Sequence, residues 1–174
     1  PSVSLHSAGQ QYFRPATAEE ALRLRAEHPQ CIVINGSTDV ALRQTKQHEV
    51  LPALLDLSGV QDWQAMHETT EDLRVGSGCR LEILRSFAEQ RLPVLHQMLD
   101  VFASLQIRNV ATAGGNIGSA SPIGDLLPVF MALNTSVVLT SAKQERRLPL
   151  KEFILGYRKT ALQADEIITA LMIP

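Results

Sequence analysis

The residues best suited to chemistry lie in two stretches that are poor in large side chains. The longer one, TAGGNIGSASPIGDLLP (112–128), combines four glycines with small hydroxyl side chains, one asparagine and one aspartate, directly before an apolar segment. The shorter one, NGSTD (35–39), follows an apolar run. Neither contains a lysine, and no pair of acid–base residues has a spacing that favours proton transfer. The two stretches therefore favour ligand binding, and we expect no catalytic side chain.

The stretch 35–39 is predicted to join a buried strand to a helix. Backbone N–H groups at the start of a helix have no acceptor within it, and the helix dipole adds positive potential, so the position suits an anion. Gly36 would let a ligand approach the backbone, and Ser37 and Thr38 add hydroxyl donors. Asp39 would repel phosphate, so we expect it to cap or brace the loop. A plain strand–helix turn closed by an Asp cap explains the same residues equally well.

The stretch 112–128 is predicted to be a loop up to Ser121, followed by a helix. Gly114 and Gly115 remove two Cβ atoms and permit positive φ, which suits close passage of a flat or phosphorylated ligand and also suits a sharp turn without any ligand. Two such loops in one chain favour a dinucleotide, which has a pyrophosphate and two ring systems to place. The polar candidates in this stretch are Thr112, Asn116, Ser119, Ser121 and Asp125.

The composition limits which classes of protein the chain can belong to. The chain has 174 residues, 45% of them hydrophobic and 20% charged, with a formal net charge of −2. These values are typical of one globular domain or two tightly joined lobes, and they predict neither nucleic acid nor an anionic membrane as partner. The two cysteines and five histidines show neither disulfide nor metal-ligand spacing, so we expect no metal and a reducing, cytoplasmic location. The ends, Pro1 and a strand-like EIITALMIP, predict a piece cut from a longer chain at both ends.

The first 60 residues alternate between strand and helix patterns. Thr17 and Glu20 form a capping-box pattern before a helix over 17–28. Apolar runs at 31–34 and 53–58 are predicted to be buried strands, and 40–47 a short helix. This order predicts a small α/β lobe with a short parallel sheet over residues 1–60.

Residues 61–174 have a different pattern, which predicts a larger lobe of antiparallel sheet flanked by helices, and hence an α+β class overall. Ser121 is the expected N-cap of a helix whose first residue is Pro122. Arg146 and Arg147 are expected to be an exposed charge pair on a hairpin. The other predicted elements are strands at 73–79, 136–140, 146–150 and 166–174 and helices at 80–90 and 92–105.

Three segments together resemble a known family. QIRNVATAGGNIGSASPIGDLLPVFMALN (106–134) and FILGYRKTALQADEIITALMIP (153–174) closely resemble the FAD-binding domain of xanthine dehydrogenases, which belong to the molybdenum hydroxylase family. IVINGSTDVALRQTK (32–46) is similar to that family's first flavin loop. The GYRKT segment (156–160) resembles the xanthine dehydrogenase branch more than the carbon monoxide dehydrogenase branch.

The resemblance implies a PCMH-type FAD-binding fold, in which FAD lies between the small and the larger lobe. It assigns the first loop to the pyrophosphate and places Phe102 and Ile168 beside the cofactor. The residues it implies at FAD are Val33, Ile34, Asn35, Gly36, Ser37, Thr38, Asp39, Val40, Phe102, Thr112, Ala113, Gly114, Gly115, Asn116, Asp125 and Ile168.

Several of these residues also have structural explanations. Phe102 and Ile168 would be buried with or without flavin, Asn116 could close a turn, and Asp125 would offset a helix dipole. Arg108 and Lys159 could steer NAD or phosphate, or be surface residues.

The resemblance also implies a redox function shared with other parts of an enzyme. Electrons would pass from iron–sulfur clusters to FAD and leave as hydride to NAD, while substrate is oxidised at a molybdenum cofactor in another subunit. The iron–sulfur domain and the molybdenum subunit are the implied partners, so this chain alone would not carry out the reaction. One departure is Asn35-Gly36-Ser37 in place of the commoner double glycine. Two alternatives are a flavin subunit of the aldehyde oxidase or carbon monoxide dehydrogenase type, and a degenerate assembly domain without FAD.

Overall fold

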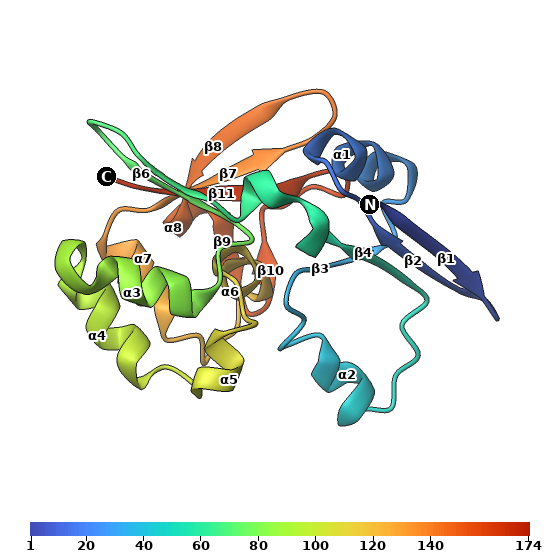
Figure 1. Cartoon of the computed structure of the whole chain (residues 1–174), viewed down its shortest axis with the longest axis horizontal. Coiled ribbons are helices and arrows are strands. Elements are labelled where there is room, and N and C mark those ends of the chain that lie inside the picture. The colour runs from blue at the N-terminus through green and yellow to red at the C-terminus, as the bar shows by residue number, and fades with distance from the viewer.

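The computed structural model describes residues 1–174 and contains two main sheets. The small sheet has the order β1-β2-β4-β3, in which β2–β4 and β3–β4 are parallel pairs and β1 is antiparallel to β2. Its strands are β1 (Val3–Ser7), β2 (Gln10–Arg14), β3 (Ile32–Ile34) and β4 (Ala53–Asp56). The predicted short parallel sheet is therefore present, with β1 added as an exposed edge strand that projects from the molecule (Figure 1).

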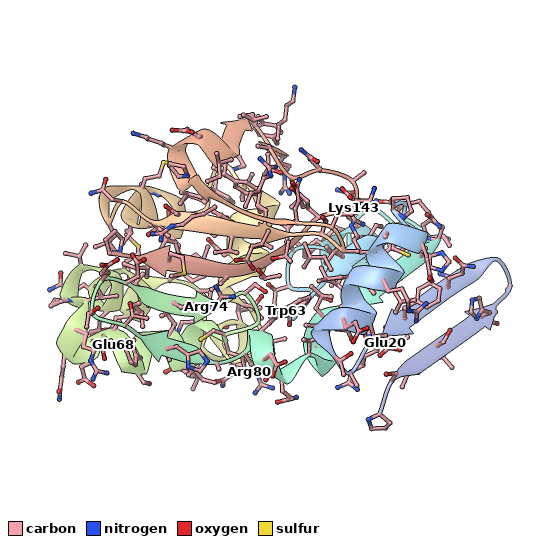
Figure 2. The ribbon with its side chains drawn as sticks, turned by 90° about the horizontal axis from the view of Figure 1, so that it is seen from above. Glu20, Trp63, Glu68, Arg74, Arg80 and Lys143 are labelled. Atoms are coloured by element: carbon pink, nitrogen blue, oxygen red, sulfur yellow. The ribbon has the colours of Figure 1, made fainter.

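Two helices connect the strands of the small sheet, and two 3₁₀ turns lead away from it. α1 (Ala18–Glu27) is capped as predicted, because the Thr17 side chain accepts from the Glu20 N–H at 3.2 Å. α2 (Ala41–Thr45) follows the first loop. The 3₁₀ turns η1 (Leu57–Gly59) and η2 (Gln61–Trp63) run toward the large sheet, with Trp63 near the junction (Figure 2).

The large sheet is antiparallel throughout, with the order β5-β6-β11-β7-β8. Its strands are β5 (Met66–Glu68), β6 (Leu73–Gly76), β7 (Ser136–Thr140), β8 (Glu145–Pro149) and β11 (Ile167–Ile173). Helices pack together on one side of it (Figure 1): α3 (Leu81–Arg91), α4 (Pro93–Val101), α5 (Leu105–Arg108), α6 (Ala113–Ser119), α7 (Leu126–Ala132) and α8 (Leu150–Phe153). A short ribbon of β9 (Ile154–Gly156) and β10 (Lys159–Thr160) completes the fold. The α+β class is confirmed.

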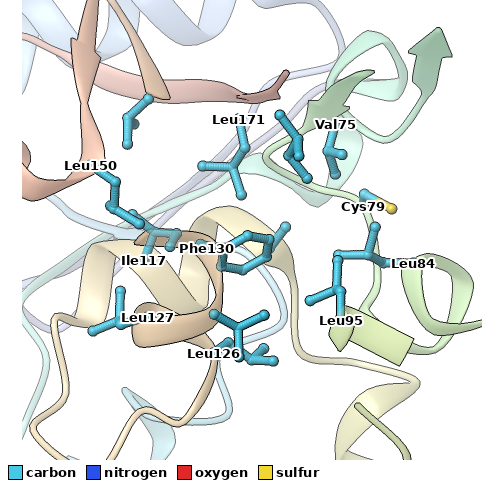
Figure 3. Packing of buried hydrophobic residues seen from close by; sticks show 14 of the residues in the cluster. Val75, Cys79, Leu84, Leu95, Ile117, Leu126, Leu127, Phe130, Leu150 and Leu171 are labelled. Carbon is cyan, nitrogen blue, oxygen red and sulfur yellow. The ribbon is translucent and has the colours of Figure 1, made fainter. Parts of the chain in front are cut away.

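Two hydrophobic cores lie under the two sheets, and we call the parts built on them the small lobe and the large lobe. The larger core surrounds Phe130 (Figure 3). The smaller core gathers Phe13, Leu55 and Trp63, and it also contains Ile167 from β11. Because successive residues of a strand point to opposite faces, Ile167 joins the small core while Ile168 joins the large one. The start of β11 therefore links the two lobes.

A buried arginine strengthens this link. Arg25 of α1 donates from Nε to the Glu166 carbonyl at 3.2 Å and from Nη1 to the Cys31 carbonyl at 2.8 Å. Its burial lowers the pKa of the guanidinium. These bonds tie α1 and the start of β3 to the start of β11.

The helix predicted to begin at Pro122 begins four residues later. The Gly124 N–H donates to the Ser121 carbonyl at 3.0 Å, which closes a turn, and α7 then starts at Leu126 with Asp125 at its N-cap position. The reason is Pro128. A helix from Pro122 would place Pro128 in its interior, where proline removes a backbone hydrogen bond and clashes with the preceding turn. In the first turn of α7 the same proline is tolerated.

The expectation of an exposed arginine pair on a hairpin is confirmed for Arg147, which is exposed on the β7–β8 hairpin, and wrong for Arg146, which is partly buried. Arg146 donates to both carboxylate oxygens of Glu166, at 2.7 and 2.9 Å, and to the Ala161 carbonyl at 2.9 Å. Glu166 is only 1% exposed. Arg147 pairs with Asp72 at 2.8 Å. Sequence alone could not show that a loop carboxylate would lie against this strand.

None of the helices is both long enough and apolar enough to cross a bilayer.

The Arg146–Glu166 pair predicts a specific loss of stability in acid. The hydrogen bonds from Arg146 hold the pKa of Glu166 below its usual range. A carboxylate with a depressed folded pKa stabilises the protein above its unfolded pKa, and that contribution is lost as pH falls through the folded value. Glu166→Gln should lower the free energy of unfolding by about 2 kcal/mol at neutral pH and flatten its acid dependence. Urea unfolding across acid pH measures both, with Glu89→Gln as the exposed control.

Candidate functional site

A cleft of about 660 Å³ lies between the first loop and α6, a volume typical of cofactor sites. It is lined by both lobes, including β3 with the loop after it, the α4–α5 turn, α6 and the start of β11. The two predicted binding stretches approach each other directly. The Thr112 hydroxyl donates to the Asn35 carbonyl at 3.4 Å, although the two residues are 77 positions apart.

Gly36 lies where no side chain fits. Its φ is +78°, and a Cβ atom there would stand 2.1 Å from the Val110 carbonyl oxygen. The next residue, Ser37, also has positive φ, at 58°. Two successive residues with positive φ are uncommon outside glycine and turn the chain sharply after β3. The turn brings Gly36 against Val110 of the large lobe.

The first loop has a run of free backbone donors. The N–H groups of residues 36–40 donate to no acceptor within the chain, and the first bonded N–H after them is that of Ala41, to the Ser37 carbonyl at 2.8 Å. Four of these residues, 37–40, line the cleft. Successive N–H groups in a turn form a concave site for an anion. The loop therefore has unpaired backbone donors beside the cleft that an anion could use.

Asp39 braces this loop against the other lobe. Its carboxylate accepts from the Arg158 guanidinium at 3.1 and 3.4 Å, and the hydrogen bond raises the pKa of Arg158. Arg158 lies in the turn between β9 and β10, 119 residues away. Both side chains are exposed. Sequence reasoning did not single out Arg158, although it belongs to the GYRKT segment.

The second stretch is mainly a helix and not the predicted loop. Thr112 caps α6, and its hydroxyl accepts from the Gly115 N–H at 3.1 Å. The N–H groups of Ala113 and Gly114 donate to the carbonyls of Cys79 and Ser77 at 2.9 and 2.8 Å. The first turn of α6 therefore has no free donors for a ligand.

The paired glycines of α6 serve close packing instead of positive φ. Neither Gly114 nor Gly115 has positive φ. A Cβ at Gly114 would lie 2.5 Å from Cβ of Ser77, so only glycine lets α6 approach the loop after β6. Glycine costs about 1 kcal/mol in a helix interior, and tertiary contacts outweigh this propensity here.

The remaining predicted residues divide into two groups. Phe102, Asn116 and Ile168 line the cleft together with Val33 and Ile34 of β3. Ala113 and Asp125 do not line it. Ala113 is fully buried, and Asp125 is exposed because α7 begins later than predicted.

Two other polar residues near the site have structural roles. Arg108 pairs with Glu82 at 2.7 Å and donates to the Phe102 and Ala103 carbonyls, each at 2.9 Å, so it holds the turn that carries Phe102. Burial raises the pKa of Cys79 to about 11, which keeps this thiol protonated at neutral pH.

Comparison with known proteins identifies the family. The model of the FAD binding domain in molybdopterin dehydrogenase matches residues 6–174. The chain belongs to this family of FAD-binding domains. It is 34% identical to the xanthine dehydrogenase of Emericella nidulans, covering 94% of this chain and 13% of that protein. It is 31% identical to the xanthine dehydrogenase/oxidase of Gallus gallus, again covering 94% of this chain and 13% of that protein. The FAD-binding domain thus spans about an eighth of the length of these curated relatives.

Solved structures share its fold. A carbon monoxide dehydrogenase from Hydrogenophaga pseudoflava superposes with a TM-score of 0.89 at 22% identity, over 98% of this chain and 60% of that chain. Quinoline 2-oxidoreductase from Pseudomonas putida 86 superposes with a TM-score of 0.88 at 22% identity, over 97% of this chain and 59% of that chain.

The polar atoms of the cleft fit a cofactor such as FAD. Asn35 Nδ2, Ser77 Oγ and Asn116 Oδ1 are buried without a hydrogen-bond partner, and all three residues line the cleft. Buried polar atoms in native proteins are normally paired. Together with the free N–H groups of residues 36–40, they provide what a molecule with a diphosphate and polar rings requires.

Gly36→Ala should separate the two lobes at the loop. The variant would meet both the positive φ and the Val110 carbonyl, at a cost of about 2–4 kcal/mol. Gly9→Ala is the matched control, because Gly9 has φ +81° and a Cβ there would meet nothing within 4 Å. It should cost only about 1 kcal/mol. Equal losses in thermal unfolding would show that the contact with Val110 is unimportant.

Proposed function

We propose that this FAD-binding domain is the flavin part of a xanthine dehydrogenase that transfers electrons from iron–sulfur clusters to NAD. Whole-chain identities of about 30% to several xanthine dehydrogenases support this branch of the family. FAD supplies the chemistry that turns single electrons into hydride. The rest of the enzyme would contain the iron–sulfur domain, the NAD site and the molybdenum centre that oxidises the substrate. We place the enzyme in the cytoplasm because both cysteines of this chain are buried and free.

The observation that carries this proposal is the run of free N–H groups at residues 36–40. A diphosphate offers several charged acceptor oxygens at once, and hydrogen bonds to charged acceptors are stronger than those to neutral ones. The adjacent cleft has room for the rings on either side. The Asn35-Gly36-Ser37 departure leaves the backbone donors intact, because they do not depend on a second glycine. This argues against the degenerate assembly domain.

The binding residues we propose lie in both lobes, with the boundary between lobes at about residue 60. Residues 33–40 would hold the diphosphate, and Phe102 and Ile168 would contact the flavin rings. Gly36 would act through its backbone N–H, Ala113 only by packing behind the wall that α6 forms, and Asp125 from the edge of the cleft. Thr112, Gly114, Gly115 and Asn116 complete the set on α6.

Ligand selectivity tests the proposed diphosphate site. The full-length protein should bind one FAD, and ADP should compete for it, whereas riboflavin should bind at least about tenfold more weakly than FAD because it lacks phosphate. Flavin fluorescence after removal and re-addition of cofactor measures each affinity. Equal binding of FAD and riboflavin would remove the role assigned to residues 36–40, and absence of flavin from an intact fold would favour the assembly-domain alternative.

Arg158 should matter because it neutralises Asp39 beside the diphosphate. Arg158→Ala leaves that carboxylate unpaired, so FAD affinity should fall by about fivefold at low ionic strength and by less at high ionic strength. Asp39→Asn combined with Arg158→Ala should restore it. A double variant no better than Arg158→Ala would mean that Arg158 contacts FAD directly.

A further inference from the structure

The free edge of the small sheet is β1, and nothing in the chain covers it. All five of its residues are exposed, and the strand projects from the molecule (Figure 1). A sheet edge offers unpaired N–H and C=O groups to any other strand, so native proteins usually block it with charge, proline, a bulge or a very short strand. β1 has none of these devices, because its sequence is VSLHS and it pairs with β2 over its whole length without a bulge.

The other edges of the two main sheets are blocked. β3 and β5 have three residues each, and β5 ends in Glu68. β8 carries Glu145, Arg146, Arg147 and Pro149. Residues 1–13, by contrast, include no aspartate, glutamate, lysine or arginine, although these types make up 20% of the chain. A second strand that approaches β1 therefore meets no charged side chain from this hairpin.

The register of the sheet fixes which main-chain groups of β1 face outward. The Gln11 N–H donates to the Pro52 carbonyl at 2.9 Å, so the main chain of Gln11 is turned toward β4. Residues directly opposite in an antiparallel pair alternate between bonded and non-bonded pairs. Gln11 and His6 are therefore a non-bonded pair, and the N–H and C=O groups of His6, and by the same alternation those of Ser4, face away from β2. No hydrogen bond outside the sheet uses these four groups.

These outward groups are arranged symmetrically about Leu5. A second copy of β1 can lie antiparallel to the first, with the two-fold axis at Leu5. Ser4 then lies opposite His6 of the second copy, and His6 opposite its Ser4, so two bonded pairs form with two hydrogen bonds each. The two Leu5 residues lie opposite one another in the non-bonded pair between them, with their Cα atoms about 4.5 Å apart. A second copy therefore satisfies all four outward groups of each strand.

The side chains of this pairing continue an apolar row. Leu5 lies opposite Tyr12, and Tyr12 lies beside Leu54. Leu54 lies in turn beside Ile32, so the row crosses all four strands. It occupies the face opposite α1, because the neighbouring Phe13 points into the small core. Leu5 ends the row and is 59% exposed, and contact with a second Leu5 would cover it.

We propose that β1 is a self-association strand. Two copies of the chain pair antiparallel through β1, with Leu5 against Leu5, and join their four-stranded sheets into one. Two such short strands bury less than the roughly 1,200 Å² of a stable interface, so the dimer should be weak and form at about 100 μM protein. β3, whose following loop lines the cleft, is at the opposite edge of the sheet, so this pairing does not depend on FAD.

Charge at residue 5 tests the pairing in the full-length protein. Leu5→Lys and Leu5→Glu each place like charges opposite one another, so each variant alone should associate about tenfold more weakly than the wild type. An equimolar mixture should regain association, because opposite charges then meet across the two-fold axis. Sedimentation velocity with one variant fluorescently labelled measures each case. The mixture is compared with each variant alone, so contacts elsewhere in the full-length protein cancel.

Ile83 of α3 provides the matched control. It is a half-exposed aliphatic residue of the large lobe, 51% exposed. Ile83→Lys and Ile83→Glu should associate like the wild type, both alone and mixed. A mixture of these two variants that associates as strongly as the mixed Leu5 variants would show unspecific charge attraction and overturn the proposed pairing.

Proline at residue 4 tests the main-chain bonds separately from the Leu5 side chain. The Ser4 N–H faces away from β2, and proline is tolerated on an edge strand where the N–H faces solvent, so the melting temperature of Ser4→Pro should stay close to that of the wild type. Each copy loses one donor to its partner, and self-association should weaken by about tenfold. Association of Ser4→Pro equal to the wild type, or a wild-type protein that stays unassociated up to about 1 mM, would overturn the proposed pairing.

Discussion

The close contact between Gly36 and the Val110 carbonyl is the constraint on which the site depends. A single Cβ atom at residue 36 would lie 2.1 Å from that oxygen, so the loop can reach the large lobe only without a side chain. The residues that follow this contact, 37–40, line the cleft. The same turn places Asp39 within reach of Arg158, and Asn35 within reach of Thr112.

The two glycine-bearing segments have different physical tasks. In α6 every N–H of the first turn is bonded within the chain, and Gly114 permits dense packing against Ser77. In the first loop the glycine produces a turn, and five successive N–H groups have no acceptor. One segment therefore forms a wall of the cleft, and the other offers the donors. Buried polar groups are costly to leave unpaired, so their concentration in one cleft marks it as a binding site more clearly than its glycine content does.

β11 joins the two lobes behind this cleft. Ile167 packs into the small core and Ile168 into the large one, while Arg25 bonds to the carbonyl of the preceding residue, Glu166. Glu166 is bonded in turn by Arg146. The lobes are thus held at β11 by burial and by several hydrogen bonds, whereas Asp39 of the first loop is tied to the large lobe by an exposed ion pair with Arg158. Exposed pairs contribute little stability, so the ion pair is the weaker of the two connections.

The α+β class, the strand and helix order of the small lobe and the family could all be predicted from the sequence, because hydrophobic periodicity, the Thr17 cap and the motif residues are local signals. It also singled out both segments of the cleft. The coordinates were needed to show that 113–119 is a helix, that α7 starts at Leu126, that Asp39 pairs with Arg158 and that Ser77 lines the cleft. These features depend on contacts between residues far apart in the chain, and such contacts override local propensity and leave no trace in residue spacing.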